Sequence, residues 1–378
     1  MELLKNHLRN IDVNEKIKAH HLFVLLTSFY ILFSSISSFS GFLALFSAIF
    51  FYMSYIVGER LYYILNLDDI SNCASIFNLK KPYRPNYPKH YKFGLFLMFI
   101  GILFIFFDIL WVKDIPLFDP TSRRFLNVPF TALSHLLLLG WAIAAASNLS
   151  LNKIKVIVYS IVFSALIMLL GYRTNVMILF LSILFVMYYS NKIKTKELIY
   201  STFGIFLILL SMSILRLYVL GSGGNPIFSR IDLTMSIFDI IVKNFNGVFN
   251  GLIHYCSIYS YIGTFPGPRT VVANSIGVYG VTITPTIFGA VIGDYGTLGI
   301  IPYFGILGIF LGLFYKISES LKGIYLGVYA ILISYLLVGI ETGILDFDVI
   351  LFYIFGFILC IYIILLKILN KLKKLKRE

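Results

Sequence analysis

Residues 154–190 read IKVIVYSIVFSALIMLLGYRTNVMILFLSILFVMYYS, and this stretch decides the fold. Lys155 and Arg173 are its only charged residues. A helix needs about 20 apolar residues to cross a hydrocarbon core about 30 Å thick. The stretch is therefore too long for one crossing and long enough for two. Gly171 marks the break, so the sequence predicts two membrane helices joined by a tight turn at GYRTNV (171–176).

The whole chain shares this apolar character. It has 378 residues, of which 59% are hydrophobic and only 13% charged, whereas soluble domains carry about 25% charged residues. Backbone groups in lipid must bond within their own segment, so apolar runs of this length predict helices. We expect an all-α, polytopic membrane bundle of about ten transmembrane helices. The predicted spans are 21–38, 41–57, 93–112, 129–147, 155–171, 174–190, 198–220, 298–315, 323–340 and 347–366.

The basic residues are divided unequally between the two sides of this bundle. With ten spans, one side holds both chain ends and 23 of the 31 Lys and Arg residues. Cytoplasmic loops are rich in Lys and Arg. We therefore predict a multi-pass protein of the cytoplasmic membrane, in contact with membrane lipids, with both termini cytoplasmic. The net charge of +13 is mostly a topology signal, and the sequence offers no nucleic-acid-binding motif.

Arginine dominates the other, external side, which has 2 Lys and 6 Arg. The planar guanidinium grips phosphate and carboxylate groups in a bidentate way that an ammonium group cannot copy. The skew therefore predicts an anionic ligand at the external face. The alternative is that single arginines bond carbonyls at helix ends or lipid phosphates. The predicted substrate-binding residues are Arg123, Arg124, Arg173, Arg216, Arg230 and Arg269.

The middle of the chain departs from the membrane pattern. Residues 221–297 are too polar for lipid and too apolar for free water, and they form one long external segment with ten spans. We expect amphipathic or re-entrant helices there, within a single membrane domain over residues 1–378. Segments 245–265 and 275–293 are alternative full spans, which would raise the count to twelve.

Three motifs resemble those of the oligosaccharide repeat-unit polymerases, the Wzy-type or O-antigen polymerase family. They are TPTIFGAVIGDYGTLGIIPYFGILGIFLG (284–312), DIPLFDPTSRRFLN (114–127) and GYRTNV (171–176). The resemblance implies a membrane glycosyltransferase that polymerises polyprenyl-pyrophosphate-linked oligosaccharide repeat units into a surface polysaccharide outside the cytoplasmic membrane. It also implies a flippase and chain-length regulators as partner proteins.

The chemistry of such a transfer suggests roles for particular residues. A leaving pyrophosphate needs cations, and the attacking hydroxyl needs a base. No cluster has metal-ligand spacing, so we expect the arginines in place of Mg²⁺, and no cofactor. The candidate bases are His254, Asp294 and Glu341, with Asp232 and Asp239 as weaker candidates. His254 is alternatively an interfacial polar residue, while Asp294 and Glu341 are alternatively partners of arginines.

Other functions remain open from the sequence. An O-antigen ligase would share the arginine-rich external segment and differ in its acceptor. A flippase or transporter of lipid-linked glycan would also be polytopic and cationic, but inverted repeats and charges at mid-bilayer, which such proteins show, are not evident. A membrane scaffold would not need the external arginines.

Overall fold

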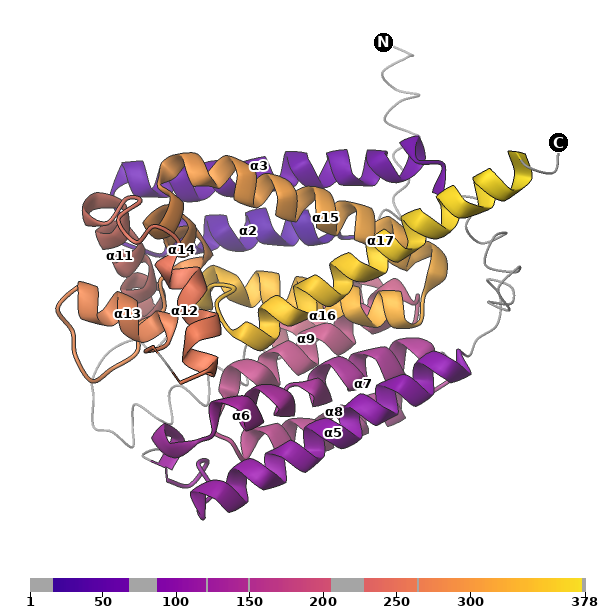
Figure 1. Cartoon of the computed structure of the whole chain (residues 1–378), viewed down its shortest axis with the longest axis horizontal. Helices are drawn as coiled ribbons and strands as arrows, with labels where there is room; N and C mark the ends of the chain where they lie inside the picture. The colour runs from indigo at the N-terminus through magenta and orange to yellow at the C-terminus, as the bar shows by residue number, and fades with distance from the viewer. Residues whose placement is uncertain are drawn as a thin grey trace, which may run out of the picture.

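The computed structural model describes residues 16–67, 87–119, 122–148, 150–204, 228–263 and 265–375, and these form helices and turns with no strand. The helices pack side by side as a bundle, with a group of shorter helices at one end (Figure 1). Their bounds are α2 Ala19–Leu32, α3 Ser38–Ile64, α5 Pro88–Val112, η2 Ser122–Phe125, α6 Val128–Ser134, α7 Leu136–Ser147, α8 Lys153–Met168, α9 Arg173–Tyr189, α11 Phe228–Asn244, α12 Leu252–Tyr261, α13 Pro268–Ser275, α14 Thr286–Tyr295, η3 Thr297–Gly299, α15 Ile300–Leu321, α16 Ile324–Thr342 and α17 Phe347–Leu375.

Six segments of this described part are long and apolar enough to cross a membrane. They are Ser38–Ile64, Pro88–Val112, Val128–Ser147, Thr297–Leu321, Ile324–Thr342 and Phe347–Leu369. The protein is thus an all-helical, multi-pass membrane protein. Large apolar side chains on α5 and α17, such as Phe99 and Phe357, are exposed on the bundle surface, where lipid would cover them.

The count of ten or twelve spans is not confirmed. Helices α2, α8 and α9 have 14, 16 and 17 residues, fewer than the roughly 20 of a full crossing. The predicted span at 198–220 lies mostly outside the described residues, of which 198–204 are helical. The two alternative spans at 245–265 and 275–293 contain helices α12 and α14, each of 10 residues. At 1.5 Å per residue such a helix is about 15 Å long, too short to span as one helix.

Local sequence explains where several helices begin. Ser37 precedes α3 and its hydroxyl accepts from the backbone N–H of Ser40, while the side chain of Asn127 caps α6 through Phe130 N–H. The side chain of Asn152 caps α8 in the same way. These caps satisfy backbone donors that the first turn of a helix leaves unpaired.

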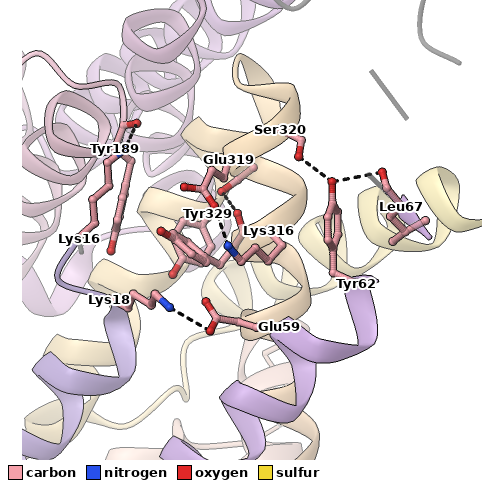
Figure 2. Close-up of polar contacts among 12 residues, drawn as sticks. Lys16, Lys18, Glu59, Tyr62, Leu67, Tyr189, Lys316, Glu319, Ser320 and Tyr329 are labelled. Carbon is pink, nitrogen blue, oxygen red and sulfur yellow. Dashed lines mark hydrogen bonds and ion pairs between the residues drawn. The ribbon is translucent and has the colours of Figure 1, made fainter. Parts of the chain in front are cut away.

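One end of the bundle, which we call the terminal end, gathers the starts of α2, α5 and α16 with the ends of α3, α7, α9 and α15 (Figure 1). Figure 2 shows its polar contacts. Lys18 pairs with Glu59 at 3.1 Å, and Tyr62 shares hydrogen bonds with Ser320 and the carbonyl of Leu67. These contacts tie α2, α3 and α15 together.

Helices α3 and α15 approach each other through glycine. A Cβ added to Gly312 would lie 2.0 Å from the carbonyl oxygen of Tyr55, and one added to Gly58 would lie 2.2 Å from that of Ile309. Both distances are far below van der Waals contact, so the two backbones touch only because these positions lack side chains. The pair forms the most closely packed seam of the bundle.

The opposite end, which we call the cap end, carries helices α11–α14 (Figure 1). Helix α14 is buried from Thr286 to Asp294 and packs against α11, α12, α15 and α16. Helix α11 is held to the turn between α2 and α3, because Asp232 accepts from Ser35 N–H and Asp239 accepts from the hydroxyls of Ser37 and Ser40. The cap helices are therefore packed onto the bundle. The single-domain expectation, with an external segment at 221–297, stays a prediction.

Candidate functional site

The turn between α16 and α17 carries three carboxylates at the cap end. Helix α16 ends at Thr342, followed by Gly343 with a φ of 74°, a conformation that glycine adopts without strain. The segment ETGILDFD (341–348) then leads into α17, with Asp348 in its first turn, where a negative charge offsets the helix dipole. Each carboxylate has a nitrogen-bearing partner from a different part of the chain: Glu341 pairs with Arg230, Asp346 with Arg269, and Asp348 with the imidazole of His135.

Arg269 and Asp346 form a two-point ion pair. The two terminal nitrogens of Arg269 donate to the two oxygens of Asp346 at 2.9 and 2.7 Å. Partial burial opposes ionisation of Asp346, but attraction to Arg269 outweighs it and lowers the pKa of this carboxyl below its ordinary value. The Nε of Arg269 is buried and has no partner among the described residues. The pair joins α13 to the start of α17.

Glu341 is the meeting point of three helices. The Nε of Arg230, from α11, donates to Oε1 at 2.7 Å, and the hydroxyl of Tyr30, from α2, donates to Oε2 at 3.2 Å. The arginine side chain is 54% exposed, whereas that of Glu341 is 25% exposed. The sequence had suggested an arginine as a partner of Glu341, and the structure supplies it.

His254 and Asp294 form a second kind of site. Asp294 lies in the last turn of α14, and its side chain is fully buried. Its oxygens accept from the backbone N–H groups of Ile253 and His254 at 2.9 and 3.0 Å, so a carboxylate from another helix caps the start of α12. The same carboxylate lies 2.5 Å from Nδ1 of His254.

This arrangement fixes the character of the imidazole. A carboxylate only accepts hydrogen bonds, so in the neutral ring the proton is on Nδ1 and Nε2 keeps its lone pair. That Nε2 is buried and has no partner among the described residues. The rings of Tyr295 and Tyr303 lie 5.5 and 5.7 Å from the imidazole between centroids. The carboxylate thus holds the imidazole through Nδ1, while Nε2 has no partner among the described residues.

A further His–Asp pair was missed by the sequence reasoning. His135 separates α6 from α7, and its Nδ1 lies 2.5 Å from an oxygen of Asp348. Its Nε2 lies 2.6 Å from the amide nitrogen of Asn175, so both ring nitrogens are occupied. A histidine inside the apolar span predicted at 129–147 is costly unless it is paired, and that cost could have drawn attention to His135.

Comparison with known proteins agrees with the picture of a multi-pass membrane protein. A sequence model of the family described as "Putative O-antigen polymerase" matches residues 16–353. The chain belongs to this family. No solved structure matches it.

Two uncharacterized proteins of Methanocaldococcus jannaschii are similar to this O-antigen polymerase family member. The first is 58% identical over 356 residues, which is 94% of this chain and 97% of the relative. The second is 28% identical over 290 residues, which is 75% of this chain and 70% of the relative.

In this family member the turn GYRTNV lies against η2. The guanidinium of Arg123 sits 4.7 Å from the ring centroid of Tyr172, and a Cβ on Gly171 would come within 2.9 Å of the Arg123 side chain. Arg173 begins α9 and is exposed at the cap end. Asn175, two residues further along the chain, contacts His135. One turn therefore carries an exposed arginine and supports a partly buried histidine.

The remaining predicted residues are placed as follows. Arg124 lies in η2, and its side chain is outside the described part; Arg216 falls in the undescribed residues 205–227. Asp232 and Asp239, the weaker base candidates, accept hydrogen bonds from the turn between α2 and α3. Burial opposes ionisation of Asp239, but hydrogen bonds from Lys243 and from the two serines lower its pKa to about 2. Such a group is a poor base at neutral pH.

Within the described residues, no three His, Cys, Asp or Glu side chains are arranged to hold a metal ion.

Among the predicted site residues, the structure brings together His254 with Asp294, Arg230 with Glu341, and Arg123 with the turn before Arg173. It does not bring the three candidate bases together, because Glu341 bonds to Arg230 and Tyr30 while Asp294 bonds to His254.

Proposed function

We propose that this protein is an oligosaccharide repeat-unit polymerase. It joins a growing glycan, released from its polyprenyl-pyrophosphate carrier, to a new lipid-linked repeat unit on the outer face of the cytoplasmic membrane. Family membership and the multi-pass bundle support the general role. The observation that carries the enzymatic proposal is that Asp294 holds Nδ1 of His254, while Nε2 has no partner among the described residues.

In the proposed step, Nε2 of His254 takes the proton of an acceptor hydroxyl as the hydroxyl oxygen attacks the anomeric carbon of the donor sugar. A new C–O bond forms while the bond from that carbon to the pyrophosphate oxygen breaks. The electron pair of the broken bond leaves with the polyprenyl pyrophosphate. The proton stays on His254 until the product departs. Asp294 positions the ring and stabilises the imidazolium that forms.

The arginines of the cap end are proposed to hold the leaving pyrophosphate. Arg173 and Arg230 are exposed, and Arg230 uses its Nε and one terminal nitrogen for Glu341, which leaves N–H groups for a phosphate. Arg269 has both terminal nitrogens on Asp346, so we assign it to holding α13 in place. Glu341 likewise positions Arg230 and is not the base.

Deletion of the gene, with analysis of surface glycan length, tests the proposal. A polymerase defect leaves single repeat units on the surface, and re-expression of the wild-type protein restores long chains. Re-expression of His254→Ala at matched protein level leaves single units. Full-length polymer that accumulates without attachment indicates a ligase instead, and lipid-linked units trapped inside the cell indicate a flippase. Either result contradicts the proposal.

A further inference from the structure

Three half-exposed tyrosines lie on the two helices that carry His254 and Asp294. Tyr255 and Tyr259 lie one turn apart on α12 and are 56% and 49% exposed, and Tyr295 at the end of α14 is 48% exposed. The ring of Tyr295 lies 5.5 Å from the His254 imidazole. The side of α12 that carries Ile253, Cys256 and Ser257 is buried. The helix is thus anchored on one side and presents tyrosine rings on the other.

The turn before α12 fixes the position of the Tyr255 ring. Gly251 has a φ of 87°, and a Cβ at this position would lie 2.8 and 3.2 Å from two atoms of the Tyr255 ring. Only glycine meets both conditions without strain. The ring therefore rests on the backbone of the Gly251 turn, next to His254 in the chain. Tyr259 is supported in turn by the ring of Phe265, at 6.5 Å between centroids.

We propose that Tyr255, Tyr259 and Tyr295 form a glycan-binding subsite that holds sugar rings of the acceptor repeat beside His254. This inference rests on the proposed function and identifies where its carbohydrate substrate binds. The C–H face of a pyranose ring carries partial positive charge and packs on the negative face of an aromatic ring, while the phenol hydroxyl serves as a hydrogen-bond partner for sugar hydroxyls.

The location favours a sugar as the occupant. A membrane surface would need only the apolar part of these rings, but here the ring of Tyr295 adjoins the imidazole of His254, whose Nε2 has no hydrogen-bond partner among the described residues. A sugar stacked on Tyr295 would lie beside the His254 imidazole, because the two rings are 5.5 Å apart between centroids. The subsite and the base then act on the same molecule.

The experiment measures binding and turnover separately. The binding probe is the soluble repeat-unit oligosaccharide, released from the host's own surface glycan and titrated against the full-length protein in nanodiscs by saturation-transfer NMR. We expect Tyr255→Ala and Tyr259→Ala each to weaken binding by roughly threefold to tenfold. Tyr255→Phe should keep most of the affinity. In a polymerisation assay, Tyr255→Ala should raise KM for the acceptor more than it lowers kcat.

Tyr200→Ala is the matched control, because Tyr200 is a 73% exposed tyrosine outside the cap. Unchanged binding and KM in both alanine variants overturn the inference, even if the wild-type protein polymerises. Conversely, oligosaccharide binding that depends on Tyr255, in a protein without polymerase activity, supports the subsite and contradicts the proposed function. The fluorescence of a Tyr255→Trp variant separates a membrane contact from a sugar contact. If brominated lipids quench this fluorescence and the oligosaccharide does not change it, the surface contacts the membrane, and the inference is overturned.

Discussion

The two His–Asp pairs at the cap end have the same core geometry and opposite surroundings. In both, Nδ1 lies 2.5 Å from a carboxylate oxygen. Asn175 occupies Nε2 of His135, whereas Nε2 of His254 has no partner among the described residues. A histidine with both nitrogens bonded is a structural link, and one with a free basic nitrogen can accept a proton. The two pairs therefore differ in whether Nε2 has a partner, and not in the carboxylate at Nδ1.

The largest effect is expected at His254. His254→Ala removes the proposed base, while Asp294 still accepts the two backbone N–H groups that start α12. We expect polymerisation by purified protein to fall roughly 10²- to 10⁴-fold, the usual contribution of a general base, with little change in thermal stability. Activity within a few-fold of wild type would remove His254 from the chemistry.

At His135 we expect a substitution to lower the stability of the protein. His135→Leu leaves Asp348 without its partner at a place where the carboxylate side chain is 9% exposed. Breaking a buried pair by removing one partner costs about 3–5 kcal/mol. Thermal unfolding in detergent, followed by circular dichroism, should show this loss. The double variant His135→Leu/Asp348→Leu should recover part of it, and a single variant as stable as wild type contradicts the structural role.

Arg173 tests whether the turn that supports His135 also serves the substrate. If Arg173 grips pyrophosphate through its planar fork, Arg173→Lys keeps the charge and loses the geometry. A charge-assisted hydrogen bond contributes about 1.5–3 kcal/mol, so we expect roughly 10- to 100-fold lower polymerisation, and a larger loss for Arg173→Ala. Polymer length in cells at matched expression gives the answer, and wild-type length from the lysine variant excludes Arg173 from the site.

The smallest effect is expected at the partly exposed pair of Arg269 and Asp346. Because the folded-state pKa of Asp346 is lowered, its contribution is fully present above the unfolded value of about 3.9 and is lost as pH falls through the lower folded value. Exposed pairs contribute less than about 1 kcal/mol. Asp346→Asn should therefore slightly reduce the fall in the free energy of unfolding at acid pH. At pH 7 it should lower the free energy of unfolding by less than about 1 kcal/mol. A loss above about 2 kcal/mol would mean that the pair behaves as a buried ion pair.

The sequence predicted helices that cross a membrane, because a long apolar run in lipid must pair its own backbone groups and a helix does so. The paired helices around Gly171 appear as α8 and α9, with 16 and 17 residues where 17 were predicted for each. It also anticipated a partner for Glu341, since a carboxylate at a membrane rim is costly alone. It could not pair His254 with Asp294 or His135 with Asp348, because 40 and 213 residues separate the partners. Only the packing of distant helices creates these sites.

The glycine seam between α3 and α15 limits how the bundle can move. Two backbones in direct contact at Gly58 and Gly312 cannot slide past each other without collision. We infer that α3 and α15 move as one rigid unit, so the lipid-linked substrate of the proposed reaction would enter between other helices. Spin labels placed on α3 and α15 should keep a constant separation when the substrate is added. A change in that separation would mean that the seam itself is the gate.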